Sequence, residues 1–122
     1  MKVNVICDSP QRINHKWTLI EKRGRAVCSV YIFDNEAWLC NLEVMEKYRG
    51  RGLASSMIRK AIDIAARMYT DYIYLAIDGN VHNLLDCERL ESFYEQFGFV
   101  RYSVEDKYII MRFAFPPKKI IP

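Results

Sequence analysis

Residues 41–68 constrain the fold of this sequence more than any other stretch, because they read as a strand, a turn with two glycines and an amphipathic helix. In the helical part, apolar residues recur every three or four positions and therefore share one face. These residues are Leu53, Met57, Ala61, Ile64, Ala65 and Met68, with Ile58 and Ile62 widening the face. A helix of this kind must pack one side against a sheet, so the sequence predicts a fold that contains both.

The turn before this helix carries Gly50 and Gly52, with Arg49 and Arg51 beside them. The first N–H groups of a helix have no partners within the helix, and glycines leave these groups uncovered by side chains. The helix dipole adds partial positive charge at the same place, so such a turn is suited to holding phosphate. The alternative is an ordinary turn with solvated arginines. Because each glycine costs about 1 kcal/mol relative to alanine inside a helix, the phosphate interpretation is favoured.

The remaining sequence predicts an antiparallel meander, a crossover and a closing hairpin. Strands are expected at residues 1–7, 17–22, 26–33, 37–44, 72–77, 100–103 and 108–115. A second helix is expected after a loop, with Asp86 as its N-cap and Gly98 in the left-handed position at its end. We therefore expect an α/β (α+β) fold with a mixed, mostly antiparallel sheet of about seven strands and two main helices, in a single domain over residues 1–122.

Composition limits the class of protein. With 122 residues, of which 51% are hydrophobic, the chain can bury one core, and its net charge of +3 is small. No segment has ~20 consecutive apolar residues, so no membrane span is expected. The four cysteines, Cys7, Cys28, Cys40 and Cys87, form no Cys-x-x-Cys pair and have no histidine at metal-ligand spacing. We expect reduced thiols, no metal site and a cytoplasmic protein.

Two motifs resemble those of a known family. The pattern Arg-x-x-Gly-x-Ala at residues 49–54 follows a strand that ends in Leu-x-Val at residues 42–44, and it precedes a long helix. Residues 93–99 read Phe-Tyr-Glu-Gln-Phe-Gly-Phe, in which a tyrosine precedes a Gly-Phe step. In this order they are similar to the acetyl-CoA signature and the following helix of the GNAT superfamily of N-acetyltransferases. The resemblance covers about residues 37–113.

The resemblance implies an enzyme that moves an acetyl group from acetyl-CoA to an amine by direct attack, without a covalent enzyme intermediate. In that family the fourth strand bulges and separates from the fifth, which frees the backbone of Leu42 and Val44 for the pantetheine arm. The Val44 N–H is then the donor to the thioester carbonyl, where negative charge develops. In the plainer interpretation both residues only contribute to the core. The diphosphate is expected on a cradle of Arg49, Gly50, Arg51, Gly52, Leu53, Ala54 and Ser55.

The same resemblance suggests catalytic residues. Tyr94 matches the family tyrosine, whose hydroxyl protonates the departing thiolate; the alternative is a core aromatic residue. Glu43, on the fourth expected strand, is the candidate base that deprotonates the amine; its alternative is a solvent-facing strand residue. Glu36 is a weaker candidate. His15 and His82 lie in expected loops and are interpreted as surface histidines.

The sequence departs from the family pattern in two places. The family often has an asparagine seven residues before the tyrosine, and here that position is Cys87, so Asn80 or Asn83 is expected to take over its contact with the cofactor. The family also has two helices between its first two strands, where they cover the acceptor site. Residues 8–16 are too few for two helices, so we expect these helices to be reduced or missing. Acceptor recognition is then more open, or is supplied by another subunit or partner.

Other functions stay open at this point. A non-catalytic GNAT-like module that binds acyl-CoA or another protein would carry the same motifs. Nucleic-acid binding through the basic turns at residues 22–25 and 47–51 is not expected, because the basic residues form no run. The expected partners are therefore acetyl-CoA and an unidentified amine. A homodimer is possible if residues 108–115 form an exposed edge strand.

Overall fold

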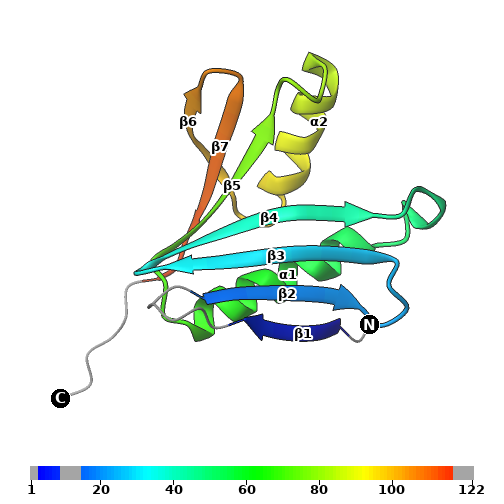
Figure 1. The fold of residues 1–122 in the computed structure, drawn as a ribbon. Helices are drawn as coiled ribbons and strands as arrows, with labels where there is room; N and C mark the ends of the chain where they lie inside the picture. The colour runs from blue at the N-terminus through cyan, green and yellow to red at the C-terminus, as the bar shows by residue number, and fades with distance from the viewer. Residues whose placement is uncertain (1–2, 9–14, 117–122) are drawn as a thin grey trace.

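The computed structural model describes residues 3–8 and 15–116, and Figure 1 shows its ribbon. Its strands are β1 (Val3–Asp8), β2 (His15–Glu21), β3 (Ala26–Phe33), β4 (Glu36–Val44), β5 (Tyr72–Asp78), β6 (Val100–Glu105) and β7 (Tyr108–Ala114). Its helices are the short 3-10 helix η1 (Glu46–Tyr48), α1 (Leu53–Arg67) and α2 (Leu84–Glu95). The strands form a seven-stranded sheet in the order β1-β2-β3-β4-β5-β7-β6. The predicted sheet and its two main helices are therefore confirmed.

The sheet is antiparallel everywhere except between β4 and β5. These two strands run in the same direction, so the chain must return across the sheet between them, and α1 makes that crossover. The strand, turn and helix that begin at residue 41 therefore occupy the middle of the fold. Every element described below as part of the site lies within or next to this unit.

Both main helices pack on the same face of the sheet. The buried residues of α1 belong to the predicted apolar face: Leu53, Met57, Ile58, Ala61, Ile64 and Ala65. Cys87 of α2 belongs to the same core cluster. On that face, Arg101 of β6 also forms an ion pair with Glu91 of α2, with 2.6 Å between Nη2 and Oε1. Residues on the other face of the sheet are thus not covered by α1 or α2.

That other face carries aromatic side chains. Trp38 in β4 and Tyr74 in β5 each lie between two core residues in the sequence. Trp38 and Tyr74 themselves do not belong to the core cluster. Because neighbouring residues of a strand point to opposite faces, both side chains point away from α1 and α2. Their rings stack on each other with 5.1 Å between centroids.

The expected edge strand at residues 108–115 is wrong. β7 lies between β5 and β6, so it is an interior strand, and β6 forms this edge of the sheet. The cause is the connection through α2. It places β6 one strand away from β5, which leaves a gap between them that β7 fills. β7 then pairs with the strands on both sides of this gap. Its edge is therefore not available for pairing with a second chain.

The start of the second helix also differs from the prediction. The N-cap is Asn83, whose Oδ1 accepts the N–H of Asp86 at 2.8 Å, so Asp86 lies in the first turn. A cap oxygen binds the N–H two or three residues further on, and an acidic residue there is favoured by the helix dipole. The predicted positive φ at Gly98 is confirmed at 99°, beyond the C-cap residue Gln96.

Residues 9–14, where helices were expected to be reduced or missing, lie outside the described residues. Within the described ranges, no helix combines the length and the apolar character that crossing a membrane requires.

Candidate functional site

β4 and β5 lie side by side only where they begin. Residues 36–38 of β4 pair with residues 72–74 of β5, and beyond them the strands diverge, as Figure 1 shows. The register between β4 and β3 shifts in the diverging part of β4, and this shift adds one residue to β4. Within this bulge, Asn41 adopts the left-handed conformation, with φ 54°. The bulge and the separation implied by the family resemblance are both present.

The separation opens a cleft of about 1280 Å³. Its walls are the ends of β4 and β5, the turn that leads into α1, and one side of α2. The predicted site residues that line it are Leu42, Glu43, Val44, Arg49, Gly50, Gly52, Leu53, Ala54, Ser55 and Tyr94. Arg51 does not line it. The structure thus brings together residues from two distant parts of the sequence, although their roles stay predictions.

The backbone of β4 offers hydrogen-bonding groups to this cleft. The N–H of Met45 donates to the carbonyl of Arg25, on the β3 side, at 2.8 Å. Successive residues of a strand direct their N–H groups to opposite sides. The N–H groups of Val44 and Leu42 are therefore directed toward the gap with β5, where no strand pairs with them. These are the two positions that the family resemblance implied for the pantetheine arm.

The turn into α1 is open to solvent. Gly50 and Gly52 both have φ 79°, which side chains rarely tolerate, and an added Cβ would meet nothing within 4 Å at either position. Among the bonds of the described residues, none uses a backbone N–H of residues 50–55. Arg49 folds back and donates from Nε to the carbonyl of Val44 at 3.2 Å. The turn therefore presents a row of free N–H groups at the positive end of a helix, next to the cleft.

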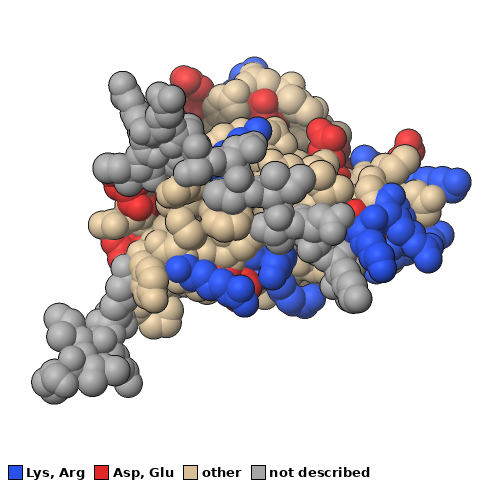
Figure 2. Space-filling model, turned by 60° about the horizontal axis from the view of Figure 1, so that its bottom comes forward, with Lys and Arg blue, Asp and Glu red and all other residues tan. Residues whose placement is uncertain are grey.

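Positive side chains surround this turn through Tyr48. Arg25, Lys47 and Arg51 all lie 5.4 to 5.6 Å from the centroid of its ring. Figure 2 shows Lys and Arg side chains gathered at the end of the molecule where the β2–β3 and β4–α1 turns lie. Cations attracted to one ring are held close together, and their joint field favours an anionic ligand at the turn.

Arg25 is also fixed from the sheet side. Glu21, only 2% exposed, accepts hydrogen bonds from Nε of Arg25 at 2.7 Å and from Nη2 at 3.1 Å. These bonds lower the pKa of Glu21 from its ordinary value of 4.5 to about 2. The carboxylate thus stays ionised at neutral pH and orients the guanidinium toward Tyr48.

Tyr94 reaches the cleft from α2. Its ring packs against Phe93 and Phe99, with centroids 5.5 and 6.1 Å away, and its hydroxyl forms no hydrogen bond with the described residues. Burial raises the pKa of this hydroxyl, and the nearby Cys28 thiol raises it further. The hydroxyl therefore keeps its proton at neutral pH, and this proton is not engaged in a hydrogen bond with the described residues.

Four groups that line the cleft can accept a proton, namely Glu43, Glu46, Asp78 and His82. Glu43 is exposed and lines the cleft from β4, while Glu46 lines it from η1. Asp78 and His82 line the opposite wall, at the end of β5 and in the loop after it. From sequence, His82 is expected to be a surface histidine because loop histidines usually are. Its position directly after a strand that ends at the cleft is the signal that was available. The expected substitutes Asn80 and Asn83 do not line the cleft, and the Asn83 oxygen caps α2.

Two cysteines lie close to the bulge. Burial raises the pKa of the Cys28 thiol to about 12 and also raises that of Cys40, which lines the cleft. Both are free thiols, as is Cys87. Since the thiolate is the reactive form of cysteine, neither side chain is prepared to act as a nucleophile.

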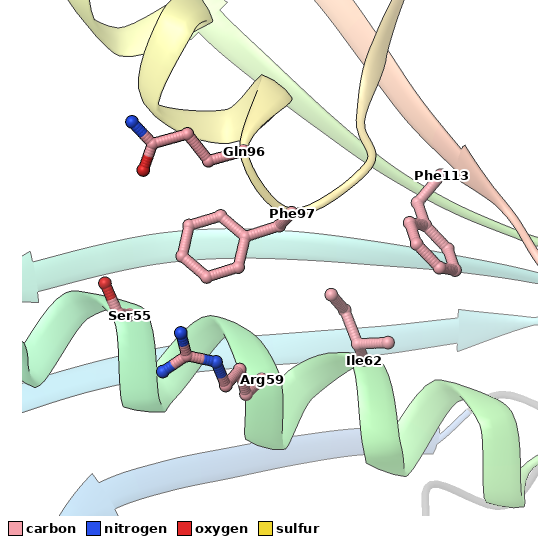
Figure 3. Close-up of a pocket in the computed structure, with 6 residues that line it drawn as sticks. All are labelled: Ser55, Arg59, Ile62, Gln96, Phe97 and Phe113. Atoms are coloured by element: carbon pink, nitrogen blue, oxygen red, sulfur yellow. The ribbon is translucent and has the colours of Figure 1, made fainter.

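A second, smaller groove of about 490 Å³ adjoins the turn on the helical face. Figure 3 shows Ser55, Arg59 and Ile62 along α1 facing Phe97 and Gln96 at the end of α2, with Phe113 at one end. Arg59 lies over the ring of Phe97 at 5.5 Å. Ser55 lines both the groove and the larger cleft, so the two cavities meet at the glycine turn.

A strand pair that opens beside a glycine turn is the arrangement that the motifs implied, and the comparison with known families agrees. The family model of the Acetyltransferase (GNAT) domain matches residues 14–101. The chain belongs to the GNAT family. Among residues 3–8 and 15–116 of this GNAT chain, no group of three or more His, Cys, Asp or Glu side chains is arranged to hold a metal ion.

Solved structures share the GNAT fold at low identity. The PaiA N-acetyltransferase from Thermoplasma acidophilum, in complex with coenzyme A, has a TM-score of 0.66 and 17% identity over 82% of this chain. This chain spans 60% of the length of that protein.

Two relatives match over nearly their whole length. A GNAT family acetyltransferase from Elizabethkingia anophelis with acetyl-CoA bound has a TM-score of 0.68 and 10% identity, over 93% of this chain and 98% of that one. A Bacillus subtilis acetyltransferase in complex with CoA has a TM-score of 0.68 and 11% identity, over 94% and 100%. No curated protein matches the sequence.

Proposed function

We propose that this GNAT chain is an N-acetyltransferase, which moves an acetyl group from acetyl-CoA to an amine by direct attack. One observation carries the proposal. The glycine turn with its free N–H groups and the N–H groups of Leu42 and Val44, with which no strand pairs, lie along one cleft that Tyr94 also lines. Family membership and the CoA-bound relatives support acyl transfer from a CoA thioester in general. We further propose that residues 1–122 form one such domain.

Each part of the cleft has a proposed task. The glycine turn binds the diphosphate, and the backbone of Leu42 and Val44 holds the pantetheine arm. Acetyl-CoA supplies the thioester as a substrate. The Val44 N–H stabilises the negative charge that develops on the thioester oxygen, and Tyr94 gives its proton to the departing thiolate. Because burial raises its pKa, Tyr94 is protonated before each turnover.

The amine must lose a proton before or during its attack. An amine with a reference pKa near 10.4 is mostly charged at neutral pH, which leaves about three units for the protein to overcome. Glu43 is the proposed base because it lies on β4, the strand that carries the thioester site. His82 and Asp78 are rivals from the opposite wall.

The alternative of an acyl-enzyme on cysteine has no support in the cleft. Cys40 is the only cysteine that lines it among the described residues, and burial raises the pKa of its thiol. A group that stays protonated does not compete with an amine for the thioester. Direct attack therefore fits the cleft better than a two-step transfer.

The smaller groove is the proposed site for the nucleotide end of CoA. It begins at Ser55, so a ligand whose diphosphate lies on the turn can continue along α1 into it. Phe97 offers a ring for stacking, and Arg59 offers a positive charge for a phosphate.

A thermal-shift titration with acetyl-CoA, CoA and GTP tests the proposal, combined with detection of free CoA thiol when amines are added. We expect stabilisation by acetyl-CoA and CoA alone, and thiol release only when an amine is present. Equal stabilisation by GTP would contradict a specific CoA site. Stabilisation by CoA without thiol release for any amine would favour the binding-module alternative.

A further inference from the structure

The sheet face opposite α1 and α2 carries a row of rings that we call the aromatic face: Tyr31, Phe33, Trp38, Tyr72, Tyr74 and Tyr102. Register places Tyr31 beside Trp38, and Trp38 beside Tyr74, on three neighbouring strands. Tyr74 in turn meets the edge of the Tyr102 ring at 5.7 Å. The row therefore crosses the sheet from β3 to β6.

Trp38 connects this row to the cleft. It is the last residue of β4 that pairs with β5, so it stands where the two strands begin to separate. It lines the cleft, is half-buried, and is stacked on Tyr74, which is only 7% exposed. The indole is thus held by one neighbour while part of its surface remains open to a ligand that enters from the aromatic face.

Two carboxylates stand further along the same opening. In β4, Glu43 is paired in register with Val27 on the face that Trp38 shares. In β5, Asp78 lies an even number of residues after Tyr74, so its side chain is on the same face. Both line the cleft, one from each wall.

The charges differ between the two ends of the cleft. The end at the glycine turn has three cations, Arg25, Lys47 and Arg51, around Tyr48 and one carboxylate, Glu46. The end at the aromatic face has two carboxylates, Glu43 and Asp78. An anionic ligand is therefore attracted to the first end and a cationic ligand to the second.

Two cations of the aromatic face are held over rings. The Lys16 ammonium lies 5.5 Å from the ring centroid of Tyr31. The Arg112 guanidinium lies 4.4 Å from the ring centroid of Tyr72 and 4.2 Å from that of Tyr102, between the two rings. In the register, Arg112 stands beside Tyr74 on the side away from β4. Its charge is thus placed beyond Tyr74 as seen from Trp38.

We propose that the acceptor is a small cationic amine with a flat aromatic body, which lies on Trp38 while its ammonium group faces Glu43 and Asp78. This inference rests on the proposed function, since it names the substrate of the same cleft. The exposed part of the indole accepts a second ring in an offset stack, and the carboxylates lower the free energy of the charged amine before it is deprotonated. An acceptor with its own carboxylate beside the amine is repelled by the same two groups.

The test uses 2-phenylethylamine, 2-cyclohexylethylamine and phenylalanine as acceptors with saturating acetyl-CoA. The first two carry the same charge and are similar in size, but only 2-phenylethylamine has a flat aromatic ring. We expect kcat/KM to be about three- to tenfold higher for phenylethylamine than for cyclohexylethylamine. We expect kcat/KM for phenylethylamine to be about tenfold or more above kcat/KM for phenylalanine. Equal values for the first two amines, or a preference for phenylalanine, would overturn the inference.

Substitutions locate the effect. Trp38→Leu should raise KM for phenylethylamine about tenfold and leave KM for acetyl-CoA unchanged, and Trp38→Phe should restore most of the affinity. Phe33→Leu is the matched control, because Phe33 lies on the aromatic face but does not line the cleft. If Phe33→Leu has the same effect as Trp38→Leu, or if Trp38→Leu weakens acetyl-CoA equally, Trp38 is not the acceptor site.

Binding separates this inference from the proposed function. Calorimetry with CoA present measures the affinity of each amine without any turnover. If acetyl-CoA binds and transfer occurs but amines without rings are preferred, only the acceptor inference fails. If acetyl-CoA does not bind, the proposed function fails. If phenylethylamine neither binds nor reacts while acetyl-CoA binds, the acceptor inference is overturned, and a protein acceptor or a second chain on the aromatic face becomes the explanation to pursue.

Discussion

At the α1 end of the cleft the groups offered to a ligand are backbone N–H groups of residues 50–55, whereas at the Trp38 end they are side chains of β4 and β5. The first end depends on two glycines and on the start of one helix, so a local stretch of sequence determines it. The second end depends on the register of strands that are distant in sequence. A cofactor common to many enzymes can be bound by backbone, while side chains can change with the acceptor.

The largest expected effect is at the backbone end. Gly52→Val places a side chain in the open turn at φ 79° and displaces the N–H groups that face the diphosphate. Loss of two charge-assisted hydrogen bonds lowers affinity for acetyl-CoA by about 100-fold or more in calorimetry. Asp106→Val is the control, because Asp106 also has a positive φ, 53°, in the exposed β6–β7 turn but does not line the cleft. Similar losses in both variants would show that strain alone is responsible.

The next effect separates binding from chemistry. Tyr94→Phe removes a hydroxyl that forms no hydrogen bond with the described residues, so the fold and the affinity for acetyl-CoA should be retained. The rate constant kcat should fall about 100-fold, because the thiolate then leaves without a proton donor. Tyr108→Phe, in the β6–β7 hairpin, is the matched control. Unchanged kcat in Tyr94→Phe would remove this residue from the mechanism.

The base at the side-chain end can be assigned from pH profiles of kcat/KM. A base acts in its deprotonated form, so the rate of the unchanged protein should rise with pH until the base has lost its proton. Glu43→Gln should lower kcat/KM about tenfold at pH 7 and flatten its rise with pH. His82→Gln should keep the rise of kcat/KM with pH. The reverse pattern would assign the role to His82, on the opposite wall.

A smaller effect is expected in the groove along α1. Arg59→Ala removes the positive charge beside Phe97 and should raise KM for acetyl-CoA about fivefold without a change in kcat. Arg67→Ala is a control on the same helix, because Arg67 is engaged with Asp63 outside the groove. An equal rise in KM for both variants would indicate a general charge effect instead of a nucleotide site.

The smallest effect concerns the stability of the backbone end. The hydrogen bonds from Arg25 lower the pKa of Glu21 from 4.5 to about 2. The ionised carboxylate therefore stabilises the folded state at pH values above the pKa that Glu21 has in the unfolded chain. That contribution is complete above about pH 5 and is lost as the pH falls toward 2. Urea unfolding at pH 7 and pH 3 should show a larger loss of stability in the unchanged protein than in Glu21→Gln. Equal losses would contradict the role of this pair.

How much the sequence could predict follows from the same contrast. Periodicity and glycine spacing identified α1 and the turn at Gly50 and Gly52, since both depend on residues close in sequence. Family resemblance implied a bulge in the fourth strand but not its position at Asn41, because no local pattern distinguishes an extra strand residue. The aromatic face was not found, since its rings come together only when the strand order and register are known.

The errors have the same origin. β7 was expected at an edge because its apolar sequence is consistent with either an edge or an interior strand, and only the crossover through α2 decides. His82 lies in a loop, as expected, but local sequence could not show that the end of β5 places this loop at the cleft. Asp86 and Asn83 are equally suitable cap residues by type, and the structure shows that Asn83 is the cap.

The central claim is that free N–H groups at the start of α1 bind the diphosphate of the acyl donor. Two-dimensional 1H–15N NMR during a titration with acetyl-CoA tests it most directly, because each backbone amide gives its own signal. The account predicts that the amide signals of Gly50, Gly52 and the residues up to Ser55 shift most, with Leu42 and Val44 next. Signals that shift elsewhere while these amides remain unchanged would contradict it.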